Sequence, residues 1–135
     1  MTIELTDKEF RRLLDMVYIG NWILNSTRQE KERFADYDKV QEKLFAYCPV
    51  AGMRSLVELW KGHIFPSRAY EEGGIHEAIA DYEDAVFFDI LAEELSRRDL
   101  GIEDDMTDSD ELCERIDEYL DEFEKNGLTN VSVEM

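Results

Sequence analysis

Residues 108–126 read DSDELCERIDEYLDEFEKN, and this stretch decides the fold class. Its apolar side chains recur at spacings of three and four, which places them on one face of an α-helix. They are Leu112, Ile116, Tyr119, Leu120 and Phe123. Gly127 follows Asn126 and suits a left-handed helix stop. The stretch predicts an amphipathic helix over about 108–126.

The same periodicity runs through the rest of the 135 residues and predicts four more helices. Their ranges are about 7–25, 28–48, 51–61 and 75–97. Residues 62–74 break the pattern and are predicted to be the longest irregular connection. The alternation at 131–133 is compatible with a short C-terminal strand or a tail. We predict an all-α fold, with four to five helices packed in a single compact domain over 1–135.

Three of the helix starts have the spacing of a capping box, in which a hydroxyl and an acid three residues later satisfy free amide groups. The pairs are Thr6 with Glu9, Thr27 with Glu30, and Thr107 with Asp110. Pro49 is expected to end the second helix, because proline cannot continue it. The stripe predicted to face the core from this helix is Phe34, Tyr37, Val40, Leu44 and Tyr47.

The first helix is apolar around most of its circumference. Its predicted core face is Phe10, Leu13, Leu14, Val17 and Leu24. Met16, Ile19 and Ile23 project on the other side. A helix with two apolar faces is either central or in contact with a partner. We therefore predict that these three residues support self-association across a two-fold axis, and that Gly20 marks a close helix crossing.

Charge is the most informative property of the sequence. The formal net charge is −18, from 33 acidic and 15 basic side chains. Residues 1–60 hold 10 acids and 9 bases, whereas residues 99–124 hold 13 acids and one base, Arg115. Such a charge repels the phosphates of nucleic acids and anionic membranes, so neither is expected as a direct partner.

The acidic helix is the first candidate site. The residues predicted to bind a partner are Glu114, Asp117, Glu118, Asp121 and Glu122. Like charges at spacings of three and four destabilise a helix mildly, so a role in meeting a basic protein surface would explain their retention. The alternative is a solvated face that only maintains solubility.

The segment around 60–76 is the second candidate, because aromatic and titratable side chains gather there. Its candidate binding residues are Trp60, His63, Phe65, Arg68 and Tyr70. The alternative is that Trp60 and Phe65 fill the core while His63 and Arg68 are solvated. Weak candidates for a metal site, or for acid and base roles, are Glu72, His76, Glu77, Asp81 and Asp84.

Other chemistry finds little support in the sequence. Zinc-binding cysteine pairs, a phosphate-binding glycine loop and a serine nucleophile motif are absent, and no cofactor is expected. Cys48 and Cys113 are expected to be reduced thiols, with Cys113 on the apolar helix face and Cys48 the more accessible beside Pro49. Without an apolar span or a signal-like start, the chain is expected in the cytoplasm.

The sequence favours a small acidic, non-catalytic interaction or regulatory protein whose acidic C-terminal half binds a basic partner. In composition it is similar to nuclease-inhibiting immunity proteins and DNA-mimic inhibitors. A metal-dependent enzyme or ligand-binding protein using the His63/His76 loop and the Glu77/Asp81/Asp84 stripe is one alternative. A self-associating helical protein with a structural role, such as a homodimer, is the other.

Overall fold

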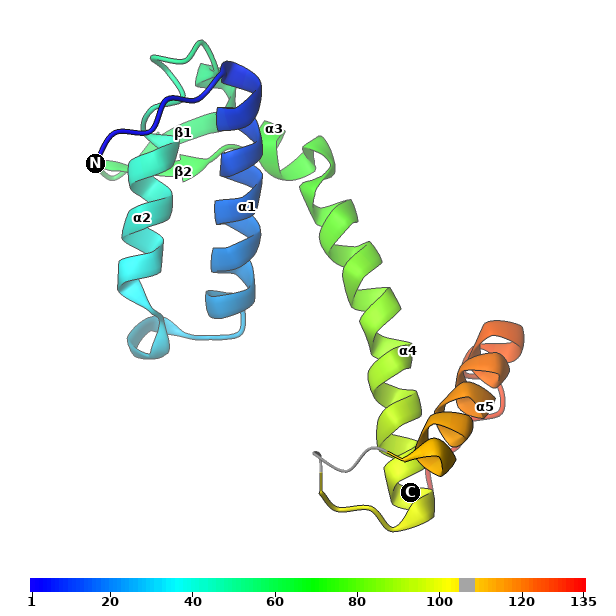
Figure 1. Ribbon diagram of the computed structural model, residues 1–135. Helices are drawn as coiled ribbons and strands as arrows, with labels where there is room; N and C mark the ends of the chain where they lie inside the picture. Colours follow the sequence, from blue (N-terminus) through cyan, green and yellow to red (C-terminus); the bar gives the residue numbers. More distant parts are fainter. Residues whose placement is uncertain (105–108) are drawn as a thin grey trace. The chain divides into compact units, whose positions relative to one another are not determined.

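The computed structural model describes residues 1–104 and 109–135. Most of them are helical, and a two-stranded sheet completes the fold (Figure 1). The predicted mainly helical fold class is confirmed. The chain divides into two compact units, the N-terminal unit (Met1–Ile79) and the acidic unit (Ala80–Met135). That they fold together as a single domain stays a prediction.

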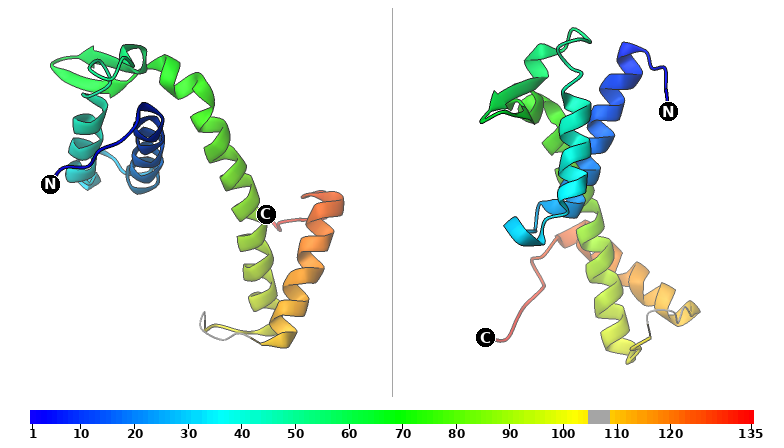
Figure 2. Two further views of the ribbon diagram at one scale, coloured as in Figure 1. Left: turned by 45° about the horizontal axis from the view of Figure 1, so that its top comes forward. Right: turned by 90° about the vertical axis from the view of Figure 1, so that its left-hand side faces the viewer.

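Two helices form the layer on which the N-terminal unit is built. Helix α1 covers Asp7–Asn25, as predicted, and begins at the predicted capping box. The Thr6 hydroxyl accepts from the Glu9 amide at 3.2 Å, and the Glu9 carboxylate accepts from the Thr6 amide at 2.8 Å. Helix α2, Ala35–Phe45, runs back along α1, and all views show the two side by side (Figures 1 and 2).

Helix α2 is shorter than the predicted 28–48, and the predicted Thr27–Glu30 capping box is not formed. Glu30–Glu32 is a single 3-10 turn without a side-chain cap. The reason lies in Asn25, whose Oδ1 accepts from the Phe34 amide at 2.8 Å and whose Nδ2 donates to the Phe34 carbonyl at 3.2 Å. This clamp holds the chain back against α1, so α2 starts only at Ala35.

The predicted helix over 51–61 is wrong. Only Arg54–Leu56 forms a 3-10 turn there, and strand β1, Val57–Trp60, follows it. Strand β2, His63–Pro66, pairs with β1 in antiparallel register. Lys61 and Gly62 have φ of 51° and 79°, as a two-residue hairpin turn of type I′ requires. The apolar spacing that imitated a helix belongs to a hairpin.

Residues 62–74 are likewise not an irregular connection. They contain β2, the helical turn α3 (Arg68–Tyr70) and most of a wide turn at Glu71–Ile75. In that wide turn Gly74 has φ 109°, which side-chain-bearing residues rarely adopt. The turn leads directly into α4, so this stretch delivers Tyr70 and Ile75 into the core.

The core of the N-terminal unit is built around aromatic rings. Its buried members are Leu14, Tyr18, Phe45, Cys48, Tyr70, Ile75 and Ile79. The Tyr70 ring, 1% exposed, lies edge-on to the rings of Tyr18 and Phe45, with centroids 5.2 and 5.1 Å away. Cys48 is buried rather than accessible, and its burial raises the pKa of the thiol.

The face that α1 turns inward differs from the predicted one. Its buried residues are Leu14, Tyr18, Asn21 and Asn25. The two asparagines can be buried because their amides are hydrogen-bonded, Asn25 Nδ2 to Asn21 Oδ1 at 2.7 Å among others. A Cβ on Gly20 would meet nothing within 4 Å, so no close crossing occurs there within the described part of the chain.

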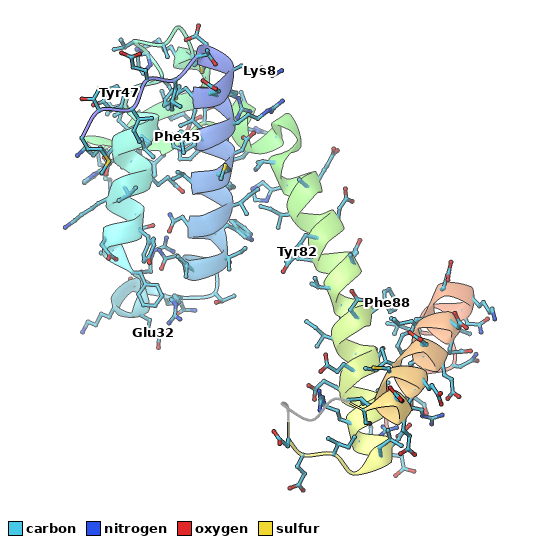
Figure 3. All side chains as sticks on the ribbon, in the orientation of Figure 1. Lys8, Glu32, Phe45, Tyr47, Tyr82 and Phe88 are labelled. Carbon is cyan, nitrogen blue, oxygen red and sulfur yellow. The ribbon has the colours of Figure 1, made fainter. Side chains whose placement is uncertain are left out.

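The acidic unit is a pair of helices. Helix α4, His76–Leu100, begins in the N-terminal unit and continues into the acidic unit, and α5 covers Asp110–Asn126. Both lie close to their predicted ranges. Ala92 of α4 and Leu112 and Phe123 of α5 are buried, and the Phe88 and Phe123 rings lie 5.4 Å apart. Figure 3 shows Tyr82 and Phe88 on different sides of α4.

The ends of α5 explain where it begins and stops. The Ser109 hydroxyl accepts from the Leu112 amide at 3.2 Å, while the predicted cap Thr107 lies outside the described residues. Gly127, with φ 57°, ends the helix as predicted. Residues 131–133 form a tail and no strand. Cys113 is exposed, contrary to expectation, because it lies off the apolar seam.

Candidate functional site

The step in charge along the chain falls at the boundary between the two units. The N-terminal unit holds 13 acidic and 11 basic side chains, a net charge of −2. The acidic unit holds 20 acidic and 4 basic side chains, a net charge of −16. The charge therefore belongs to one structural unit and is not a gradient along the chain.

The arginines of the acidic unit are bound to its own carboxyl and carbonyl groups. Arg97 is nearly buried, with Nη2 2.9 Å from Glu93 Oε1 and Nη1 2.9 Å from the Asp104 carbonyl oxygen. Arg98 and Arg115 each approach Asp99 at 2.7 Å. Because these cations are used internally, they do little to neutralise the carboxylates that face outward.

Asp99 is the centre of this internal network. It accepts hydrogen bonds from the Tyr119 hydroxyl and from the guanidinium groups of Arg115 and Arg98, and these hold the pKa of its carboxyl far below the usual range. The same contacts raise the pKa values of Arg115 and Tyr119. Asp99 thus links the end of α4 to α5 and is occupied with that structural role.

The five predicted partner-binding residues divide into two groups. Glu118 pairs with Arg115 at 2.8 Å, and Glu122 accepts from the amides of Asn126 and Asn130 at 3.0 and 2.7 Å, which lowers its pKa. The other three are exposed, and within the described residues their carboxylates have no hydrogen bond or ion pair. These outward carboxylates are Glu114, Asp117 and Asp121.

A hollow of about 310 Å³ adjoins the outward carboxylates, between the end of α4 and the first turns of α5. Its lining includes Glu111, Glu114 and Glu118, together with Arg115, Asp99 and Leu100. Sequence reasoning did not single out Glu111. The signal was present, because Glu111 precedes Glu114 by three residues and Glu118 by seven, which is one side of a helix.

The aromatic candidates of segment 60–76 lie mostly on the outer face of the hairpin. Trp60 and Phe65 are exposed rather than filling the core, with ring centroids 6.5 Å apart. His63 Nδ1 lies 3.1 Å from Glu42 Oε1, and Arg68 Nε donates to Glu72 at 2.7 Å. Tyr70 departs from the group, because it is a central core residue.

The candidate metal ligands do not form a site in the described part of the chain. Glu72, His76 and Glu77 line a hollow of about 400 Å³ in the N-terminal unit, whereas Asp81 and Asp84 belong to the acidic unit. His76 Nε2 is 2.8 Å from the Tyr18 hydroxyl. Within the described residues, no group of three or more His, Cys, Asp or Glu side chains is placed to hold a metal ion.

Two of the three predicted self-association residues are fully available on the surface of α1. Met16 is 71% exposed and Ile23 is 62% exposed, while Ile19 is half-buried and packs against the core.

Within the described residues, no helix is long and apolar enough to span a membrane.

Comparison with protein-family models, with curated proteins and with solved structures found no match to this chain.

Proposed function

We propose that this chain is a small non-catalytic interaction protein, of an inhibitor or immunity-like kind, whose acidic unit binds a basic partner protein. The observation that carries the proposal is that a net charge of −16 is confined to one compact unit, whereas the other unit is nearly neutral. A charge needed only for solubility could be distributed over the whole surface.

The arrangement on α5 supports the same proposal. Glu114, Asp117 and Asp121 are spaced by three and four residues, and like charges at these spacings destabilise a helix. No ion pair to these three carboxylates is formed within the described residues, and Arg115 is bound to Asp99 and Glu118. A basic surface would offset this repulsion on binding. Clustered charge also raises the rate of encounter and rejects partners of the wrong sign.

The test begins with the full-length chain as bait in a nuclease-treated lysate of its source cells. The bound proteins are released by raising NaCl from about 0.05 to 0.5 M, which shortens the screening length severalfold. Mass spectrometry then identifies the dominant basic protein, and its affinity for the chain is measured by calorimetry with both proteins purified. We expect the affinity to fall steeply with salt.

Two variants with the same loss of charge make the test specific. The first neutralises the outward carboxylates of α5, as Glu114→Gln, Asp117→Asn and Asp121→Asn. The control neutralises three exposed carboxylates of α4 in the same unit, as Asp81→Asn, Glu83→Gln and Asp84→Asn. We expect the α5 variant to weaken binding at least about tenfold, and the control to weaken it about threefold or less.

Two results would contradict the proposal. One is a bait that releases no basic protein with salt, which would leave the acidic unit with a role in solubility. The other is an equal loss of affinity in both variants, because bulk charge and not the α5 surface would then account for the binding.

A further inference from the structure

Each strand of the β1–β2 hairpin has an outer edge. The Ser67 amide donates to the Leu56 carbonyl at 2.9 Å, and bonded and non-bonded pairs alternate along an antiparallel ladder. The backbone groups of Val57 and Leu59 therefore point outward from β1, and those of Ile64 point outward from β2. In both views of Figure 2 the hairpin projects from the two helices of its unit. A further strand can pair with either edge unless that edge is protected.

The β2 edge is protected. The carboxylate of Glu42 on α2 accepts from the outward amide of Ile64 at 3.0 Å. Pro66, the other residue of β2 that points outward, has no amide hydrogen to donate. Because one outward amide is bound and the next is missing, a further strand finds no free donor on this edge.

The β1 edge is open. The Val57 amide donates to the Arg54 carbonyl, but the Val57 carbonyl and both backbone groups of Leu59 form no hydrogen bond within the described residues. Leu59 shares its side of the sheet with Val57 and Ile64, which pack against the core, yet it is 72% exposed. An open edge of this kind is a template for another strand, and such a strand would also cover Leu59.

The C-terminal tail has the composition of a strand. Residues 131–133 read Val-Ser-Val, in which two β-branched side chains alternate with a small polar one. The Val131 amide donates to the Leu128 carbonyl at 3.0 Å. Beyond it, no backbone group of residues 132–135 has a hydrogen bond to the described parts of the chain, and Val133 is 79% exposed. The protein thus has both an open edge and an unpaired strand-like segment.

We propose that the tail of a second copy of this chain pairs with β1 as a third, antiparallel strand, with Val131 beside Leu59 and Val133 beside Val57. In this register the Val133 amide donates to the Val57 carbonyl, and the Leu59 amide donates to the Val131 carbonyl. Both valine side chains then lie on the same face as Leu59 and cover it. Main-chain hydrogen bonds provide the affinity in strand addition of this kind.

Register and charge both favour this occupant. Ser132 lies beside Glu58 in the proposed register, so no like charges meet across the pair. The C-terminal carboxylate of Met135 falls near Arg54, an exposed base that forms no ion pair within the described residues. The described residues of one chain form only a two-stranded sheet, so the third strand comes from another molecule. Two chains that exchange tails reciprocally satisfy both open edges in a closed dimer.

Hydrogen exchange of the full-length chain, followed by NMR, tests the pairing at its central hydrogen bond. At about 0.5 mM protein we expect the Leu59 amide to exchange at least about tenfold more slowly than an unpaired amide. This protection should fall on dilution, because the strand belongs to a second molecule. Sedimentation equilibrium at the higher concentration should give twice the 15.9 kDa of the monomer.

Two proline substitutions one residue apart make the test specific. Val133→Pro removes the amide that donates to β1, whereas the control Ser132→Pro removes an amide that points away from it. We expect Val133→Pro to weaken self-association at least about tenfold and Ser132→Pro to weaken it about threefold or less. Neither amide has a hydrogen bond within the described residues, so both variants keep the fold of the two units.

Four results would overturn the inference. They are a Leu59 amide that exchanges freely at every concentration, a chain that sediments as a monomer throughout, and equal effects of the two prolines. The fourth is protection of Leu59 that survives dilution, which would assign the third strand to the tail of the same chain.

Salt separates this inference from the proposed function. Each copy has a net charge of −18, so two copies repel, and raising NaCl from about 0.05 to 0.5 M should strengthen self-association by screening that repulsion. Capture of a basic protein should weaken over the same range. Self-association that weakens with salt would show that charge holds the copies together and would overturn the inference. The paired backbone groups do not include the outward carboxylates, so either proposal can fail while the other holds.

Discussion

The two units of this chain are stabilised by different means. The N-terminal unit buries interlocking aromatic rings and a network of hydrogen-bonded asparagines. The acidic unit buries a single seam, with Ala92, Leu112 and Phe123 among its buried residues, and its net charge of −16 opposes compaction. Because its core is specifically packed, the stability of the N-terminal unit should depend mainly on core substitutions. Because its charges repel one another, the stability of the acidic unit should depend mainly on the salt concentration.

The distribution of tryptophan allows the two units to be followed separately. Both tryptophans, Trp22 and Trp60, lie in the N-terminal unit. Their fluorescence therefore reports on that unit, while far-ultraviolet circular dichroism reports on the helices of both. Each unfolding measurement is made at one fixed protein concentration, because any self-association would make the unfolding transition depend on that concentration.

The largest effect is expected from Tyr70→Ala. The ring of Tyr70 contacts those of Tyr18 and Phe45, and its hydroxyl donates to Asp15 Oδ1 at 2.9 Å. Removing a buried aromatic ring lowers the free energy of unfolding by about 3–5 kcal/mol. Urea unfolding followed by tryptophan fluorescence measures the change. Tyr82→Ala, at an exposed position of the acidic unit, should shift the same transition by less than about 0.5 kcal/mol.

A smaller effect is expected from Asn25→Ala. The substitution removes both partners of the Phe34 backbone and the donor to Asn21. Leaving such buried groups unsatisfied should cost about 1–3 kcal/mol in the free energy of unfolding, again measured by fluorescence in urea. Asn126→Ala removes one exposed hydrogen bond in the acidic unit and should leave the fluorescence transition in place. Equal shifts in the two variants would contradict the role given to the asparagine clamp.

The contrast between the two units also determines how much of the fold could be predicted from the sequence. Helices α4 and α5 were predicted closely, and in α5 the burial follows the apolar seam. The orientation of α2 was not predictable from hydrophobicity, because Asp38 and Gln41 accept hydrogen bonds from Asn21 on the side of the helix from which Phe45 enters the core. The hairpin carried a usable signal, since Lys61–Gly62 separates two short runs rich in apolar residues.

The candidate site was predictable in outline and not in detail. Composition located the charge on the C-terminal half, which coincides with the acidic unit. It could not tell that Glu118 is paired while Glu114 is outward, because Arg115 is shared between Glu118 and Asp99, 16 residues earlier. Such long-range pairing depends on how α4 and α5 pack, which local spacing does not contain.

Alkaline pH should weaken the N-terminal unit through Tyr18. Burial and the nearby Glu71 raise its pKa to about 12, against about 10 for an exposed tyrosine. Between these values the unfolded chain releases the proton and the folded chain keeps it. Stability is therefore unaffected by Tyr18 below about pH 10 and falls as the pH rises toward 12. Fluorescence-detected urea unfolding at several pH values measures this, and Tyr18→Phe should lose less stability over that range. An identical pH profile in Tyr18→Phe would assign the loss to other groups.

The smallest effect, and the one that compares the units most directly, is expected from salt. Raising NaCl from about 0.01 to 0.15 M shortens the screening length from about 30 to 8 Å, which relieves repulsion within the acidic unit. Its melting temperature, from circular dichroism, should rise by about 4–8 °C, corresponding to about 1 kcal/mol. The fluorescence transition of the nearly neutral unit should move less, and the Glu114/Asp117/Asp121 variant should respond less to salt than the wild type. If the fluorescence and circular dichroism transitions instead coincide at every salt concentration, the two units unfold as the single domain that the chain length predicts. Charge repulsion within the acidic unit would then lower the stability of the whole chain.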